Sequence, residues 1–212
     1  AASTHNDEEI LIGKLHKKLK KREEKLITII IPRHVNRTNK ILETLNNLDL
    51  NCIIHSSNQK LRKDTDIYLV DSYGESSKFY SLTNVCFVGG SIIKHGGQNP
   101  LEPARFGCKI FYGPYIQNFT EIYKLLNQNN LSSKFNNVNQ LVKLVDQSFK
   151  QNQNYTNKAI KLKKMSYDGR HPDIPWREQD IETMGYHYYM TPETAELGLK
   201  KLLVIKFKTP YT

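Results

Sequence analysis

The sequence has few cysteines and no long apolar segment. It contains three cysteines in 212 residues, an odd number with no Cys-x-x-Cys pair, which argues against both a disulfide framework and a structural zinc site. It has no run of about 18 apolar residues, so no transmembrane helix is predicted. Residues 1–9 are polar and acidic and lack the apolar core of a secretory signal. Together, these absences predict a cytoplasmic protein with reduced, buried thiols.

Acidic residues are also scarce relative to basic ones. The chain has 31 lysines and arginines against 21 aspartates and glutamates, which gives a net charge of +10. Such an excess favours an anionic partner, such as nucleic acid, a nucleotide or an anionic membrane surface. The chain is also rich in Lys, Asn and Ile, as A+T-biased coding would produce, and in that case the charge carries no function. The composition leaves both interpretations open.

Apolar and amphipathic segments alternate along most of the chain. Short apolar runs predict strands at residues 26–31, 52–54, 66–70, 85–88 and 109–112. Amphipathic patterns and end signals predict helices at residues 6–22, 36–48, 76–82, 117–128 and 138–164, with a further helix that starts near residues 99–102. This alternation predicts an α/β fold, a doubly wound parallel sheet of the Rossmann-like type. The pattern changes near residue 166, so we divide the chain into a domain at 1–165 and a C-terminal appendage at 166–212.

Two polar segments follow predicted strands, at the edge where sheets of this kind bind ligands. Pro32-Arg33-His34 follows the strand at 26–31, and its arginine offers a planar, charged group to a phosphate. Residues 71–76 follow the strand at 66–70 and end in Ser76, which suits a helix N-terminus that binds an anion. Taken alone, the first segment is more readily explained as a solvated loop after a strand. The second is a weak signal, because junctions between a strand and a helix often contain Gly and Ser.

Two glycine-containing segments come later in the chain. Gly89-Gly90-Ser91 follows the strand at 85–88, and its glycines allow a close approach of the backbone to a phosphate or sugar. Residues 96–103 lead into a helix whose first turn carries Glu102, a carboxylate that can accept hydrogen bonds from ribose hydroxyls. The alternative is that Glu102 only complements the helix dipole. Neither segment is a G-x-G-x-x-G fingerprint or a P-loop, which disfavours a generic nicotinamide enzyme or kinase.

Four histidines lie far apart in the sequence, at His5, His34, His55 and His95. We expect each to be satisfied separately, and we predict neither a metal site nor a cofactor. A phosphate in such a site can be neutralised by basic side chains and helix N-termini.

The ordered motifs resemble those of the 3-deoxy-D-manno-octulosonic acid (Kdo) transferases of lipopolysaccharide synthesis. The residues that carry the resemblance are Ser3-Thr4-His5 with Glu8-Glu9, Pro32-Arg33-His34 with Arg37, Asp71 with Gly74-Glu75, Phe87–Ser91, Gly96–Pro103, and Gly113-Pro114 with Asn118-Phe119. The resemblance covers roughly residues 1–165. It implies one half of a two-domain GT-B fold, namely the second domain, which binds the donor CMP-Kdo.

The resemblance also implies roles for individual residues. By this likeness, the CMP moiety would be bound by Pro32, Arg33, Gly74, Glu75, Ser76, Asn99, Pro100, Leu101 and Glu102. Ser3, Thr4, His5, Gly90 and Ser91 would lie near the cleft between the two domains. No specific nucleic acid is expected as a partner.

The chain departs from the family pattern in two respects. Gln98 stands where the family usually has His, which removes a potential positive charge beside the donor phosphate. The family's first domain, which carries the acceptor site, the membrane-facing surface and the catalytic base, has no counterpart in this sequence. We therefore predict no catalytic residue here and little activity for the chain alone, with CMP or CMP-Kdo as its ligand.

A separate acceptor-domain chain is the expected partner, and a lipid A precursor would bind only through it, at the cytoplasmic face of the inner membrane. The alternatives are a non-catalytic nucleotide- or polyanion-binding module and the remnant of a split gene.

The C-terminal appendage contains an aromatic segment at residues 185–191. This segment faintly resembles part of the sugar aminotransferases that use pyridoxal phosphate. It lacks their lysine-bearing domain, so we predict that it is not catalytic.

Overall fold

The structure is a computed structural model, and it describes residues 1–151. The predicted appendage at 166–212, and the end of the helix predicted at 138–164, lie outside the described residues.

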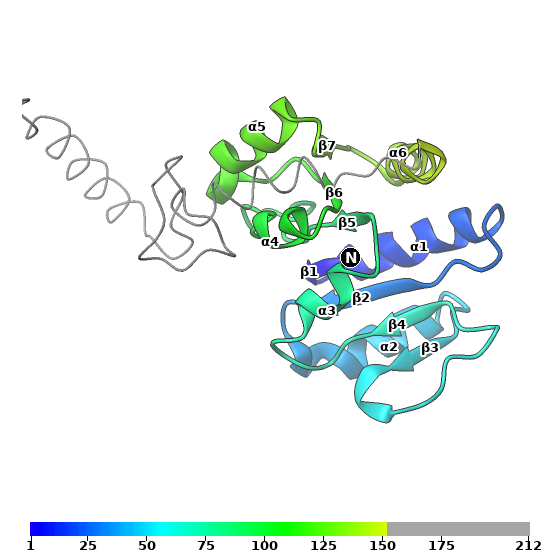
Figure 1. Cartoon of the computed structure of the whole chain (residues 1–212). Coiled ribbons are helices and arrows are strands. Elements are labelled where there is room, and N and C mark those ends of the chain that lie inside the picture. Colours follow the sequence, from blue (N-terminus) through cyan, green and yellow to red (C-terminus); the bar gives the residue numbers. More distant parts are fainter. Residues whose placement is uncertain (152–212) are drawn as a thin grey trace, which may run out of the picture. The chain divides into compact units, whose positions relative to one another are not determined.

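The described residues form parallel sheets of short strands (Figure 1). One sheet has the order β1-β2-β4-β3, built from β1 (Ala2–Thr4), β2 (Thr28–Pro32), β4 (Ile67–Leu69) and β3 (Cys52–Ile54). The other has the order β5-β6-β7, built from β5 (Val85–Phe87), β6 (Lys109–Tyr112) and β7 (Ser132–Lys134). A parallel bridge between Ala2 and Val88 joins them, and the Gly89 N–H donates to the Ala2 carbonyl at 2.9 Å. The strands therefore follow one continuous order, β3-β4-β2-β1-β5-β6-β7.

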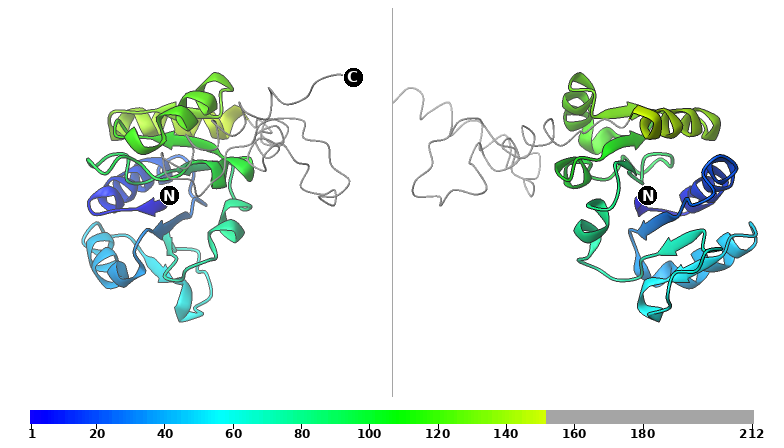
Figure 2. Two further views of the ribbon diagram at one scale, coloured as in Figure 1. Left: turned by 90° about the vertical axis from the view of Figure 1, so that its left-hand side faces the viewer. Right: turned by 45° about the vertical axis from the view of Figure 1, so that its right-hand side comes forward.

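Helices cover both faces of this sheet (Figure 2). On one face lie α1 (Glu8–Lys20), α2 (Thr38–Asn46) and α6 (Val138–Gln151), and α1 contacts both of the others. On the other face lie α3 (Ser76–Tyr80), α4 (Leu101–Arg105) and α5 (Thr120–Gln128), and α3 contacts α4. Short 3-10 turns at Val35–Arg37, His55–Ser57 and Gln117–Phe119 complete the described elements. This arrangement confirms the predicted α/β, doubly wound fold.

The main core lies between the sheet and α1. Ile12 and Leu19 of α1 are almost fully buried, as are Ile30 of β2 and Leu69 of β4. Burying one such side chain contributes about 1.5–3 kcal/mol. Gly13 allows α1 to pack closely on the end of α2, because a Cβ atom at that position would lie 2.8 Å from a methyl group of Leu48.

Two strands lack the apolar run by which the other strands are predicted from the sequence. The central strand β1 has the sequence Ala-Ser-Thr, and β7 has the sequence Ser-Ser-Lys inside an Asn-rich stretch. Both are held by their neighbours: β1 lies between β2 and β5, and β7 pairs with β6 in register from Ile110↔Ser132 onwards. The other predicted strands and helices are present within residues 1–151, some with shorter ends, such as Glu8–Lys20 in place of 6–22. β2 runs on to Pro32, one residue beyond the predicted strand at 26–31.

The strand order reverses at β1. The chain moves from β1 to β2 on one side, and β5 lies on the other side of β1. Ligands in open α/β sheets bind outside the carboxyl ends of the strands at such a reversal. No helix in the part of the chain that the structure describes has both the length and the apolar character needed to span a membrane.

Candidate functional site

The predicted motifs meet at the carboxyl edge of the sheet, on both sides of the reversal. Ser3-Thr4-His5 ends β1, Pro32-Arg33 ends β2, and Gly89-Gly90-Ser91 follows β5. This edge faces the reader in the left view of Figure 2. Pro32 is buried and pairs with Thr4, whereas Arg33 is exposed. The topology therefore brings together motifs that the sequence separates by more than fifty residues.

Glu8 joins the segments that follow β1 and β5. Its side chain is fully buried, and its carboxylate accepts four backbone N–H bonds. The donors are His5 at 2.9 Å, Gly90 at 2.8 Å, Ser91 at 3.1 Å and Ile92 at 3.0 Å. Burial raises the pKa of Glu8, and the N–H bonds oppose that shift. Because every partner is a donor, the carboxylate is ionised in this arrangement, and it fixes the shape of the edge.

Glu9 makes the corresponding connection towards β2. Its carboxylate receives both terminal nitrogens of Arg37, each at 3.1 Å, and the hydroxyl of Thr4 at 2.8 Å. The Glu9 side chain is 3% exposed and that of Arg37 is 19% exposed. The Arg33 N–H donates to the Thr4 carbonyl at 3.0 Å. The position of Arg33 at the site is therefore set by the end of β1.

The glycines after β5 serve close packing of backbone on backbone. A Cβ atom at Gly89 would lie 2.3 Å from the Ser3 carbonyl oxygen. Gly90 has a φ of +66°, a conformation that favours glycine. The N–H of Gly97 donates to the carbonyl oxygen of Gly90 at 2.8 Å, and the N–H of Gln98 donates to the carbonyl oxygen of Gly89 at 3.1 Å. The two glycine-containing segments predicted from the sequence thus pack on each other.

Ser3 and Ser91 differ in burial at this edge. Ser3 is half-buried and has a φ of +53°. The Ser91 hydroxyl is buried, donates to the Val88 carbonyl at 2.7 Å and accepts the Gly113 N–H at 3.0 Å. Both hydrogen-bonding roles of Ser91 are therefore used inside the protein.

The predicted segments at residues 71–76 and 96–103 meet through α3 and α4. The Ser76 hydroxyl donates to Glu102 Oε1 at 3.3 Å. Asn99 Oδ1 accepts the Leu101 N–H at 2.9 Å and so holds the start of α4. Pro100 and Leu101 are buried, and Glu102 is half-buried. The contact places a hydroxyl and a carboxylate side by side, a pair able to bind the hydroxyls of a sugar.

Glu75 lies in a polar network that the sequence did not predict. Its carboxylate receives Lys78 at 2.6 Å, Ser72 at 2.6 Å and the Nε2 atom of His55 at 2.7 Å. The bonds from Lys78 and Ser72 lower the pKa of Glu75 to about 2. His55 Nδ1 in turn contacts the Tyr68 hydroxyl at 2.8 Å. Glu75 is thus held in place from both sides.

The loop before Glu75 is anchored at one end and open at the other. The Asp71 carboxylate accepts hydrogen bonds from the backbone N–H of Ser56 at 2.9 Å and from the hydroxyl of Ser56 at 2.5 Å. Gly74 has a φ of +79°, and no atom would lie within 4 Å of a Cβ there. Gly74 therefore provides a turn with open space beside it.

Three of the histidines come together, contrary to the expectation that each is satisfied separately. The His5 and His95 ring centroids are 4.2 Å apart, and those of His5 and His34 are 5.9 Å apart. The amide nitrogen of Gln98 lies 3.0 Å from His5 Nε2. Burial and then His95 lower the pKa of His5 to about 4. Within residues 1–151, no group of His, Cys, Asp and Glu side chains is arranged to hold a metal ion.

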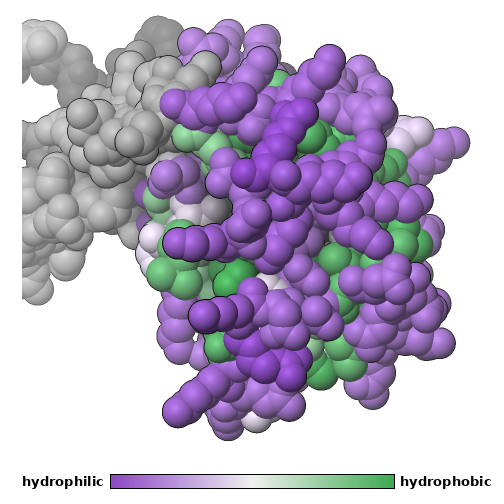
Figure 3. Space-filling view, turned by 90° about the vertical axis from the view of Figure 1, so that its right-hand side faces the viewer, coloured by the Kyte–Doolittle hydropathy of each residue, from purple (hydrophilic) through white to green (hydrophobic). Residues whose placement is uncertain are grey.

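The opposite edge of the sheet has a different character. An apolar cavity of about 200 Å³ lies there, lined by residues that include Leu26, Ile27 and Phe149. Figure 3 shows this face as mostly hydrophilic, with separate apolar patches. The cavity is lined mainly by apolar residues, so the carboxyl edge, with its charged and polar groups, is the candidate site.

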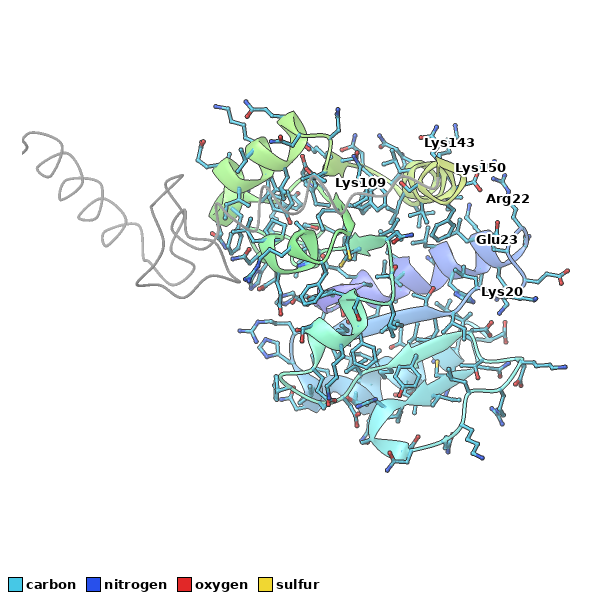
Figure 4. The ribbon with its side chains drawn as sticks, viewed as in Figure 1. Lys20, Arg22, Glu23, Lys109, Lys143 and Lys150 are labelled. Atoms are coloured by element: carbon cyan, nitrogen blue, oxygen red, sulfur yellow. The ribbon has the colours of Figure 1, made fainter. Side chains whose placement is uncertain are left out.

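Basic side chains gather at the end of α1 and along α6, away from the site (Figure 4). Several of them are paired with carboxylates. Arg22 and Lys150 both contact Asp146, at 3.3 and 3.0 Å, and Lys20 contacts Asp66 at 3.4 Å. Part of the basic excess is therefore neutralised locally, which weakens the case for a polyanion-binding surface at this edge.

No protein-family model matches the chain. The 3-deoxy-D-manno-octulosonic acid transferase of Haemophilus influenzae is 39% identical over 126 residues, which make up 59% of this chain and 30% of that protein. The protein of the same name from Rickettsia bellii is 34% identical over 145 residues, or 68% of this chain and 34% of that protein. The chain thus spans about a third of the length of the curated relatives it matches. The crystal structure of the C-terminal CMP-Kdo binding domain of WaaA from Acinetobacter baumannii matches with a TM-score of 0.70 and 31% identity, over 77% of this chain and 85% of that domain.

Proposed function

The chain belongs to the family of the 3-deoxy-D-manno-octulosonic acid transferases, and we propose that it binds the donor CMP-Kdo for the transfer of Kdo to a lipid A precursor in lipopolysaccharide synthesis. The observation that carries this proposal is the match to a CMP-Kdo binding domain over 85% of that domain, at 31% identity. The convergence of the motifs at the reversal of strand order supports it.

The phosphate side of the proposed site contains Pro32 and Arg33. Arg33 is exposed at the end of β2, and its guanidinium makes no hydrogen bond or ion pair with any described residue. A planar guanidinium in this position can bind a phosphate through two parallel hydrogen bonds. We assign the phosphate of CMP to Arg33, with Pro32 fixing the backbone before it.

The ribose side contains Glu102 and Ser76. Their contact of 3.3 Å leaves the half-buried carboxylate with further lone pairs for ribose hydroxyls. Asn99 holds the start of α4, which fixes the position of Glu102. We assign Gly74 and Glu75 to the wall of the same site, where Gly74 leaves open space.

Transfer also needs an acceptor hydroxyl with a general base within about 3 Å of it. We propose that a first domain supplies both, on the same polypeptide or on a separate chain, and that it alone holds the lipid A precursor. The complex would act at the cytoplasmic face of the inner membrane. The domain described here would then supply the donor and no catalytic residue.

The test is a calorimetric titration of the 212-residue chain with CMP, with AMP as the control nucleotide. We expect selective binding of CMP. Replacing Glu102 by Gln removes charged hydrogen bonds worth about 1.5–3 kcal/mol each, so CMP should bind about tenfold more weakly or worse. Glu121→Gln on α5, an exposed glutamate, is the matched control and should bind as the parent does.

One outcome would contradict the proposal, and another would correct the assignment of one residue. Equal binding of CMP and AMP that weakens steeply with added salt indicates a polyanion-binding module. Selective CMP binding with full affinity in Glu102→Gln removes Glu102 from the site.

A further inference from the structure

The sheet brings three imidazole rings to one point of its carboxyl edge. His5 directly follows β1, His34 follows β2, and His95 lies in the loop after β5. The ring of His5 lies 4.2 Å from that of His95 and 5.9 Å from that of His34, measured between centroids. His5 is 9% exposed, whereas His34 and His95 are exposed. The cluster therefore has one buried ring at its base and two rings open to solvent.

Gln98 defines the state of the buried ring. Its amide nitrogen faces His5 Nε2 at 3.0 Å. An amide NH₂ group only donates, so with the amide in this orientation Nε2 accepts and the proton of a neutral His5 lies on Nδ1. A protonated His5 would instead need the amide oxygen of Gln98, which a rotation of the amide group supplies. The site thus holds a neutral imidazole that can become cationic without a change of backbone.

The charged groups around His5 favour an anion. Those that face it from the adjoining elements are Glu8 and Glu9 on α1, Arg33, His34 and Arg37 after β2, and His95 after β5. Both carboxylates are already occupied, Glu8 by backbone N–H groups and Glu9 by Arg37. Of the two arginines, Arg37 is already paired with Glu9, whereas Arg33 has no carboxylate partner among the described residues and is left to face an anion from solvent.

We propose that His5, His34 and His95 form an anion subsite that receives the carboxylate of a nucleotide-activated sugar acid. The inference rests on the proposed function and extends it from the nucleotide to the sugar. Arg33 directly precedes His34 and is one of the cations that act on His5, so the cluster lies near the phosphate position assigned above. The carboxylate of Kdo is bonded to the anomeric carbon that carries the phosphate, so its carbon atom lies three bonds from the phosphorus atom.

The subsite couples donor binding to proton uptake. Burial and the neighbouring cations hold the pKa of His5 near 4 in the free protein. A carboxylate beside the ring raises that pKa, so the complex binds more protons than the free protein. CMP-Kdo should therefore bind more tightly as the pH falls from 8 to 6.

The experiment compares CMP-Kdo with CMP on the full 212-residue chain by calorimetry at pH 6 and pH 8. Because His34 and His95 are exposed, the double variant His34→Gln/His95→Gln should fold, and it is the main test. We expect the preference for CMP-Kdo over CMP to fall about tenfold in this variant, with CMP affinity changed less than twofold. Lys124→Gln, which removes an exposed cation on α5, is the control and should keep the preference. Titration at pH 6 in two buffers of different ionisation enthalpy should show proton uptake with CMP-Kdo.

Other results would overturn the inference in distinguishable ways. An unchanged preference in the double variant, with CMP binding intact, would remove the carboxylate subsite and leave the proposed function standing. An equal loss of CMP and CMP-Kdo would assign the histidines to the phosphate instead. Failure of the parent chain to bind either ligand would overturn the proposed function as well.

Discussion

Replacing Glu8 by Gln tests the connection between β1 and β5. Oε1 accepts the N–H groups of Ser91 and Ile92, and Oε2 accepts those of His5 and Gly90. Whichever oxygen becomes an amide nitrogen, two buried N–H groups then face a donor. Each unsatisfied buried donor costs about 1–3 kcal/mol.

The expected loss is smaller than the sum of these costs, because the variant no longer buries a charge. We expect the free energy of unfolding to fall by about 3 kcal/mol. Urea denaturation, followed by circular dichroism, should show a midpoint lowered by about 1–3 M for a slope of about 1–3 kcal/mol per molar. Glu121→Gln on α5 should leave the midpoint unchanged. A loss below about 0.5 kcal/mol, the size of an ordinary surface substitution, would refute the assignment of Glu8 as the connection.

Two further predictions concern backbone packing and pH. Gly89→Ala should lower stability by about 3 kcal/mol or more, because its Cβ atom would lie 2.3 Å from the Ser3 carbonyl oxygen, a position that only a separation of β1 from β5 can relieve. Gly74→Ala, with open space but a φ of +79°, should cost only about 1–2 kcal/mol in the same denaturation assay, and equal losses would contradict the packing argument. His5, with a pKa lowered to about 4, binds a proton in the unfolded chain that it does not bind in the folded one, so stability should fall as the pH decreases from 6.5 towards 4. His5→Asn should flatten that slope in denaturation curves measured across this range, and an unchanged slope would show that other groups cause it.

The apolar strands could be predicted from the sequence, whereas the two polar ones could not. β2 and β4 are rich in isoleucine and leucine because helices cover both faces of the sheet, and such runs predict a buried strand directly. β1, with the sequence Ala-Ser-Thr, has no such signal. It is a strand because β2 and the end of β5 supply hydrogen bonds to both of its edges. Its state depends on residues far along the chain, which no local pattern records.

The same limit applies to the site. The motifs at the strand ends could be predicted because the carboxyl ends of parallel strands share one edge. The histidine cluster could not, since His5 reaches His34 and His95 only once β1 is placed between β2 and β5. The network of His55 with Glu75 likewise depends on the pairing of β3 with β4. Convergence of side chains follows from strand order, and strand order depends on β1.

The two acids at the start of α1 show how the site is held at its weakest strand. Acidic residues in a first helical turn are usually explained by the helix dipole, which is worth about 0.3–1 kcal/mol at an exposed position. Here Glu8 and Glu9 are buried and their carboxylates have different partners: Glu8 binds the backbone after β5, and Glu9 binds Arg37 after β2. Adjacent residues thus connect the end of β1 to both halves of the sheet. Since Arg33 and the histidines are positioned from these same segments, loss of either carboxylate should disturb the proposed donor site even though neither one is assigned a contact with the ligand.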